Sequence, residues 1–307
     1  MSSSSQPNDP ARAAAATPRL SASIVAINPR NQVLLVQRNA RATFGGLHVF
    51  PGGNYDGRQD SSIHMTAVRE TFEESGLLVA KSAQGQTDLH SVDLAQTRAD
   101  IHSHKLLFKD FLQRHSLSVD SSHLLPFTQW ITPAGAPKRF HTHFFVVFLP
   151  ETGTTGFASG EKQDFIPTPD GGQEVISAKF LHVHEALKQF KEKRLAFMPP
   201  QYYILDTLSS ILQGDKNTAS EREQVEALAR GPFGSMVINP TPLPGAVGAD
   251  KLVLTYEGDE ARGGRSGRLH RVNFKLNKGA VVTTDVELHR NFDLRTDIDW
   301  VQVSSKL

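Results

Sequence analysis

The chain has 307 residues, and its 33 basic and 32 acidic side chains leave a formal net charge of +1. This balance provides no large uniform field to hold a polyanion, which argues against a dedicated nucleic-acid-binding protein. Cysteine is absent, so disulfides, thiolate catalysis and cysteine-ligated zinc are excluded. The best apolar run, residues 143–150, has strand length and is too short to cross a bilayer.

The first ordered elements are expected after a tail. Residues 1–18 are rich in serine, alanine and proline and show no apolar periodicity, so we expect them to be disordered, in preference to a weak organelle transit peptide. Residues 21–27 and 32–37 are predicted strands separated by a turn at residues 28–31. A glycine-rich stretch follows at residues 44–53.

The next element is a helix, predicted from about residue 63 to residue 75 and ended by Gly76. Further along, the pattern predicts a helix at 106–114, strands at 139–150 and 174–183, helices at 184–193, 201–212 and 220–230, and β-hairpins over the remainder. Strands mixed with helices in this order indicate an α/β layered fold.

The helix before Gly76 carries three carboxylates on one side. Glu70, Glu73 and Glu74 fall within one narrow sector, opposite the apolar side chains of Met65, Val68 and Phe72. Like charges at this spacing repel, so they are either solvated or neutralised by cations. Hard oxygen ligands of this kind suit Mg²⁺ or Mn²⁺. Arg69, four residues before Glu73, is placed to fix that carboxylate.

A solvated acidic face is the alternative for such a helix, and the preceding residues favour a site. Phe50-Pro51-Gly52-Gly53 stands just before the helix, and the two glycines allow the backbone to approach a ligand closely.

These residues together resemble a known motif. PGG…RETFEESGLL is similar to the Nudix box of the Nudix hydrolases, usually written G-x5-E-x7-R-E-U-x-E-E-x-G-U, and the match includes Arg69, Glu70, Glu73, Glu74 and Gly76. Two departures stand out. Thr71 occupies an aliphatic position, and the segment from Gly53 to Arg69 is two residues longer than the motif, which leaves Asp60 or Ser61 nearest to its first glutamate.

The resemblance extends to one branch of that family. Residues 33–53 are similar to the stretch before the box in Nudix enzymes acting on coenzyme A, and Arg38 aligns there. Residues 126–150 resemble a segment of the peroxisomal acyl-coenzyme A diphosphatase branch, which includes Arg139; His141 and His143 stand where that branch often carries Asp and Arg.

The resemblance implies a fold, a reaction and a set of site residues. The fold is a mixed β-sheet between helices, to which the predicted elements add a helical insertion and a β-rich C-terminal extension. The reaction is Mg²⁺- or Mn²⁺-dependent cleavage of the diphosphate of coenzyme A or acyl-coenzyme A to a 4′-phosphopantetheine species and adenosine 3′,5′-bisphosphate. The implied metal ligands are Glu70, Glu73 and Glu74, with Arg69 also catalytic and one glutamate as general base; the implied substrate-binding residues are Gly52, Gly53, Arg38 and Arg139.

The extent of this resemblance sets the expected domain limits, and the last three residues indicate the location. We expect a Nudix domain at residues 19–215, an extension at 216–304, and a peroxisomal targeting tripeptide at Ser305, Lys306 and Leu307 that an import receptor would bind. Alternatives are a Nudix pyrophosphatase acting on NADH or ADP-ribose, and a non-catalytic nucleotide-binding module.

For several other residues, the sequence favours a structural role over a functional one. Glu174 is slightly more typical of a surface residue than of a further ligand or base. His141 and His143 are predicted as polar positions opposite a core face, with contact to a substrate phosphate as the alternative. Arg262, Arg265 and Arg268 are expected in a solvated hairpin loop, with binding of a phosphate such as the 3′-phosphate of coenzyme A as the alternative. Trp130 is expected in the core.

Overall fold

A computed structural model of the chain describes residues 16–40, 45–82, 92–150, 175–245, 251–276, 283–298 and Trp300. Most of the predicted tail, the candidate Glu174 and the targeting residues Ser305, Lys306 and Leu307 lie outside the described residues.

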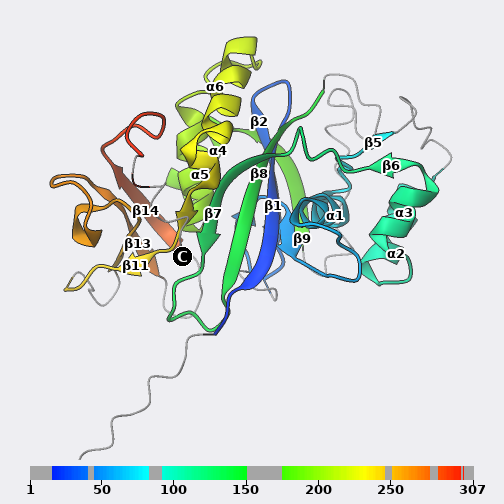
Figure 1. The fold of residues 1–307 in the computed structure, drawn as a ribbon, viewed down its shortest axis with the longest axis horizontal. Coiled ribbons are helices and arrows are strands. Elements are labelled where there is room, and N and C mark those ends of the chain that lie inside the picture. Colours follow the sequence, from blue (N-terminus) through cyan, green and yellow to red (C-terminus); the bar gives the residue numbers. More distant parts are fainter. Residues whose placement is uncertain are drawn as a thin grey trace, which may run out of the picture.

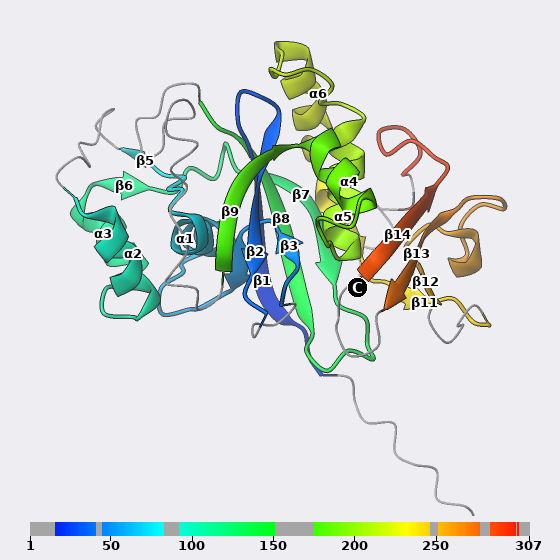
Figure 2. The same ribbon diagram turned by 180° about the vertical axis from the view of Figure 1, so that it is seen from behind.

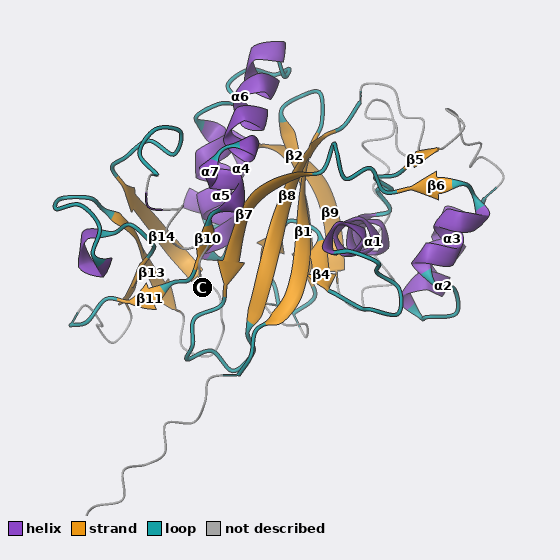
Figure 3. Ribbon diagram, in the orientation of Figure 1, coloured by secondary structure: helices purple, strands orange, loops and turns teal. Residues whose placement is uncertain are grey.

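An eight-stranded mixed sheet forms the centre of the molecule (Figure 1, Figure 3). Its path runs β10-β7-β8-β1-β2-β3, with β4 on β1 and β9 on β2. Strands β1 and β8 are parallel, whereas β1 and β2 are antiparallel. The strands are β1 (Arg19–Ile27), β2 (Gln32–Arg38), β3 (His48–Val49), β4 (Gly52–Asn54), β7 (Leu125–Ile131), β8 (Phe140–Phe148), β9 (Val175–His182) and β10 (Val237–Ile238).

One face of the sheet is covered by α1 (Ile63–Ser75), with α2 (Leu94–His102) and α3 (Phe108–Arg114) packed outside it (Figure 1, Figure 2). A two-stranded ribbon of β5 (Lys81–Ser82) and β6 (Leu117–Ser118) accompanies them. Val68 and Phe72 of α1 are fully buried here, and the Phe72 ring stacks on Phe111 with centroids 5.8 Å apart. This apolar contact anchors α1 and fixes which side of the helix faces away from the core.

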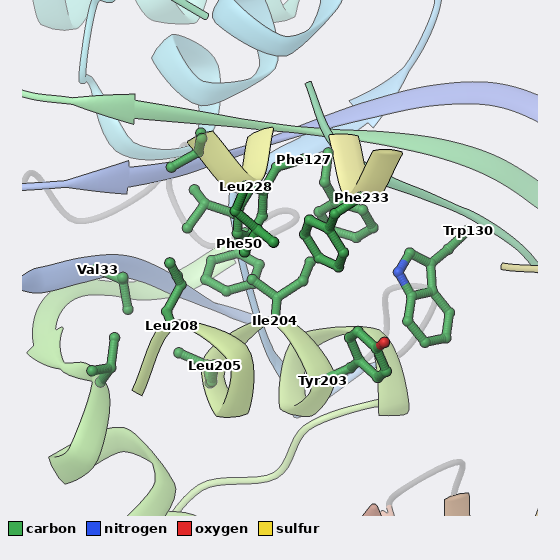
Figure 4. Packing of buried hydrophobic residues seen from close by; sticks show 14 of the residues in the cluster. Val33, Phe50, Phe127, Trp130, Tyr203, Ile204, Leu205, Leu208, Leu228 and Phe233 are labelled. Atoms are coloured by element: carbon green, nitrogen blue, oxygen red, sulfur yellow. The ribbon is translucent and has the colours of Figure 1, made fainter. Parts of the chain in front are cut away.

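The opposite face is covered by α4 (Val183–Lys191), α5 (Pro199–Ser209), α6 (Ala219–Arg230) and α7 (Pro232–Ser235). Figure 4 shows Ile204, Leu205 and Leu208 of α5 packed toward Phe50 and Val33. Trp130 is 4% exposed in the same cluster, which confirms its predicted core position.

The C-terminal part adds a four-stranded antiparallel sheet beside these helices. It consists of β11 (Thr241–Pro242), β12 (Lys251–Thr255), β13 (His270–Leu276) and β14 (Thr283–Arg290), with a 3-10 turn at Glu260–Arg262. Its buried residues Tyr256, Val272 and Phe274 continue the core cluster of the central sheet. This segment therefore shares a core with the rest of the chain, and β10 from the same segment pairs with β7 of the central sheet.

The predicted fold class, a mixed sheet between helices with a β-rich C-terminal part, is confirmed. The sequence analysis missed α2, which carries few large apolar side chains, and strand β7. It also missed β3 and β4, which have two and three residues and are too short for a periodic pattern. No described helix has both the length and the apolar character that a membrane crossing requires.

Candidate active site

The helix α1 begins and ends where its sequence predicts. The side chain of Ser62 caps the start by accepting from the Met65 N–H at 3.2 Å. Gly76 ends it in the left-handed conformation, with φ of 77° and its N–H bonded to the carbonyl of Phe72. With one side anchored in the core, the box residues are carried on the part of the helix that faces β4 and α2.

Arg69 is the centre of an ionic network on this helix. Its Nε and Nη2 donate to the two Asp60 oxygens at 2.8 Å each, and its Nη1 donates to Glu70 and Glu73, each at 2.9 Å. The predicted contact with Glu73 is therefore present. Burial of Arg69 opposes its charge, but the bonds to Asp60 and the neighbouring carboxylates outweigh it and raise its pKa above the ordinary value.

The lengthened first half of the box left either Asp60 or Ser61 nearest to the first glutamate of the motif, and the structure places Asp60 beside Arg69. It lies 3% exposed against Arg69, and it also accepts from Thr66 Oγ1 and the Asp56 N–H, both at 2.9 Å. Ser61 instead lies near the sulfur of Met65 and does not reach Arg69. The acidic partner of the box arginine is thus Asp60, at the end of the lengthened loop.

Glu73 is held from outside the motif by α2. His102 Nδ1 lies 3.3 Å from Glu73 Oε2, and Arg98 Nη2 donates to the backbone carbonyl of Glu73 at 2.8 Å. Burial raises the pKa of Glu73, but the bonds to His102 and Arg69 outweigh it and leave the pKa below the ordinary value. Sequence reasoning did not find His102 or Arg98, since neither the motif nor helix spacing connects them to Glu73.

Glu70 and Glu74 border the two box glycines. Gly52 N–H donates to Glu74 Oε2 at 2.9 Å, and Arg38 Nη1 lies 3.3 Å from Glu74 Oε1. A Cβ added at Gly53 would lie 2.4 Å from the Glu70 carboxyl carbon. The backbone therefore approaches Glu70 as closely as only glycine allows. Arg38, Gly52 and Gly53, three of the four predicted substrate-binding residues, are brought together with the carboxylates.

This donor set fits a hard divalent cation in its chemistry, because carboxylate oxygens are the ligands that such ions prefer. Glu70 and Glu74 border the glycine pair, and Glu73 lies beside Arg69 and His102. Glu70 is the most exposed of the three, with its side chain 15% accessible against 8% for Glu73 and 4% for Glu74. In the conformation described, Glu70 and Glu73 face Arg69 while Glu74 faces Arg38. Across the described ranges, no three or more His, Cys, Asp or Glu side chains are grouped around a common metal position. Holding an ion would therefore require carboxylates to turn from the arginines toward one another.

The other candidates lie away from this network. Arg139 donates to the carbonyls of Thr132 and Ala16 at 3.0 and 2.8 Å and does not contact the carboxylates. The expectation of a solvated loop at the three C-terminal arginines holds for Arg262 and Arg265, which are exposed, and is wrong for Arg268. Arg262 pairs with Glu257 at 2.8 Å, and Arg268 is 7% exposed over the Phe292 ring.

Comparison with known proteins identifies the family. The family model described as the NUDT19 Nudix domain matches residues 57–208, from the lengthened box loop to α5. The chain belongs to the Nudix hydrolase family. A solved Nudix hydrolase from Alicyclobacillus acidocaldarius has the same fold, with a TM-score of 0.50 and 22% identity over 62% of this chain and 90% of that one.

Two curated Nudix relatives are similar in sequence. A putative nudix hydrolase 7 of Caenorhabditis elegans is 28% identical over 62% of this chain, and the acyl-coenzyme A diphosphatase NUDT19 of Gallus gallus is 26% identical over 47%. The matched regions span 60% and 39% of those proteins' own lengths.

Proposed function

We propose that this protein is a metal-dependent Nudix diphosphatase that hydrolyses coenzyme A or its acyl esters. The products are a 4′-phosphopantetheine species and adenosine 3′,5′-bisphosphate. The observation that carries the proposal is the placement of Glu70 and Glu74 against Gly53 and Gly52, with Glu73 held beside them by Arg69. Similarity to the acyl-coenzyme A diphosphatase NUDT19 supports the choice of substrate.

The chemistry follows from what the chain presents to a diphosphate. Water attacks one phosphorus, and the bridging oxygen leaves with the other phosphate. A bound Mg²⁺ or Mn²⁺, held by Glu70, Glu73 and Glu74, would neutralise phosphate charge and acidify the attacking water. Arg38, beside Glu74, is placed to neutralise developing charge on a phosphate oxygen.

The network also bears on the identity of the general base. Two donors, Arg69 and His102, hold Glu73 ionised with a lowered pKa, and a lowered pKa weakens a base. We therefore assign Glu73 an electrostatic role and leave proton removal to Glu70 or Glu74.

A substrate panel tests the proposal. Purified full-length protein is incubated with coenzyme A, acetyl- and long-chain acyl-coenzyme A, NADH and ADP-ribose, each with Mg²⁺ or Mn²⁺, and products are identified by mass. We expect adenosine 3′,5′-bisphosphate from the coenzyme A substrates in the presence of either metal. Preferential cleavage of NADH or ADP-ribose would contradict coenzyme A as the substrate. Binding without turnover would indicate a nucleotide-binding module.

The proposed location is the peroxisome, with the import receptor as partner, because Ser305-Lys306-Leu307 matches the tripeptide that this receptor binds. A fluorescent protein fused to the N-terminus should be imported into peroxisomes, and deletion of Leu307 should leave it in the cytosol. Import that survives the deletion would contradict this signal.

A further inference from the structure

Three histidines gather on the α1 face of the sheet, beyond the carboxylates. His141 and His143 alternate on β8, with ring centroids 4.7 Å apart. The neighbouring Phe145 ring lies 4.5 Å from His64, near the start of α1. All three histidines are half-buried, so each is packed on one side and accessible on the other.

These imidazoles have no carboxylate partner within the described part of the chain. His141 Nε2 bonds the neutral amide oxygen of Gln129 at 2.8 Å, and no hydrogen bond connects His143 or His64 to another described residue. At the outer end of the same strand, Arg139 bonds two backbone carbonyls and no carboxylate. Burial, together with the charges of His141 and His64, lowers the pKa of His143 to about 4. A negatively charged ligand beside His143 would raise its pKa and favour the protonated imidazole.

The three histidines lie at a short distance from the box residues Gly53 and Glu70. Gly53 pairs with Ala22, and Ala22 pairs with His143, so two strand spacings of about 5 Å separate His143 from the backbone that faces Glu70. Along α1, His64 precedes Glu70 by about 9 Å. A phosphate on the ribose that carries the scissile diphosphate can span a separation of this size.

We propose that His64, His141 and His143 form a subsite for a phosphate monoester of the substrate, separate from the scissile diphosphate. In coenzyme A this group is the 3′-phosphate. The inference rests on the proposed function for the identity of the substrate. Imidazole N–H groups bind a phosphate as hydrogen-bond donors and, once protonated, as charges. Since no described carboxylate contacts these imidazoles, an anion suits this position better than a cation.

Paired substrates test the subsite. We expect the wild-type enzyme to prefer coenzyme A over dephospho-coenzyme A in kcat/KM by about tenfold or more, as expected for charge-assisted hydrogen bonds. His143→Ala and His141→Ala should each lower kcat/KM for coenzyme A and leave dephospho-coenzyme A unchanged. His143→Arg, which supplies a permanent positive charge, should restore the preference. His123→Ala, at an exposed histidine paired with Asp120, is the matched control and should change neither value.

A binding arm separates this inference from the proposed function. Calorimetry compares adenosine 3′,5′-bisphosphate with adenosine 5′-monophosphate on the wild type and His143→Ala. If no coenzyme A substrate is cleaved but the bisphosphate binds more tightly and the variant loses that difference, the subsite stands and the proposed reaction fails. The subsite is rejected if coenzyme A is cleaved with no preference over dephospho-coenzyme A. It is also rejected if the variants lower kcat/KM equally for both substrates. Thermal unfolding of each variant identifies a loss caused by misfolding.

Discussion

The guanidinium of Arg69 and the carboxylate of Asp60 form a two-point ion pair, with both donor–acceptor distances at 2.8 Å and both residues 3% exposed. The same guanidinium holds Glu70 and Glu73, so this pair fixes the position from which two of the box carboxylates are organised. The loop that supplies Asp60 is therefore part of the site.

Asp60→Ala is expected to destabilise the protein by about 3 kcal/mol, at the lower end of the range for breaking a buried pair, because Arg69 keeps Glu70 and Glu73 as partners. Urea denaturation followed by circular dichroism measures the change. Ser61→Ala, at the exposed neighbouring residue, is the control and should stay within about 0.5 kcal/mol of wild type. Equal changes in stability for the two substitutions would contradict a stabilising role for the Asp60–Arg69 ion pair.

The ionic network shows what sequence can and cannot predict here. Local helix geometry was sufficient to place Glu70, Glu73 and Glu74 together and to pair Arg69 with Glu73, because these relations depend only on spacing along α1. The apolar pattern likewise located α1 and the strands β1, β2 and β8.

The remaining parts of the site depend on tertiary packing. His102 reaches Glu73 across 29 positions and Arg38 reaches Glu74 across 36, through contacts that no local pattern encodes. Asp60 could not be chosen over Ser61 until the path of the lengthened loop was known. The gathering of His64 with His141 and His143 depends on the packing of the start of α1 against Phe145 of β8.

Replacement of the two box glycines is expected to have different effects, on stability at Gly52 and on kcat at Gly53. Gly52→Ala would place Cβ 2.2 Å from the backbone oxygen of Ala22, which cannot move without disturbing β1. We expect a loss of about 1–3 kcal/mol of stability. Gly53→Ala would meet the flexible Glu70 carboxylate at 2.4 Å, so it should displace Glu70 and lower kcat with little loss of stability.

Gly57→Ala is the matched control, because its Cβ would lie 3.5 Å from the Tyr55 ring, an ordinary contact. Chemical denaturation and steady-state kinetics on the three variants separate the effects. Parallel losses of stability at Gly52 and Gly53 would contradict the assignment of Gly53 to the Glu70 side of the site.

Glu74→Gln should lower kcat by about 100-fold or more while leaving the fold intact, because the amide keeps the shape of the side chain but loses the charge needed for metal binding or proton removal. Its bond from the Gly52 N–H can still form to the amide oxygen. Glu226→Gln, on the exposed surface pair with Arg230, is the control and should not alter turnover. Unchanged kcat in Glu74→Gln would reject its role in the reaction.

His102→Ala tests whether α2 supports the reaction. Loss of the bond to Glu73 should raise the pKa of that carboxyl toward its ordinary value, so the acidic limb of the kcat profile should move to higher pH. We expect kcat near neutral pH to fall by about tenfold, as is usual when a residue that orients a ligand is removed. Gln96→Ala, exposed on the same helix, should leave the profile in place. A uniform decrease at every pH would indicate a purely structural effect.

The buried His270 predicts how stability depends on pH. Its Nδ1 lies 2.6 Å from the Glu257 carbonyl and its Nε2 lies 2.9 Å from Tyr203 Oη, so β13 is joined to α5 through a neutral imidazole. Burial lowers its pKa from 6.5 to about 3. Between these values the unfolded chain binds a proton that the folded protein excludes, so this contribution is complete above pH 6.5 and is lost as the pH falls toward 3. The free energy of unfolding changes by about 1.4 kcal/mol per pH unit for one such group.

Urea denaturation at pH 7.5, 6 and 5 tests this prediction with the variant His270→Gln. We expect the variant to be less stable than wild type at neutral pH, and its stability to fall less as the pH is lowered. Parallel curves of stability against pH for the two proteins would show that His270 is not the titrating group.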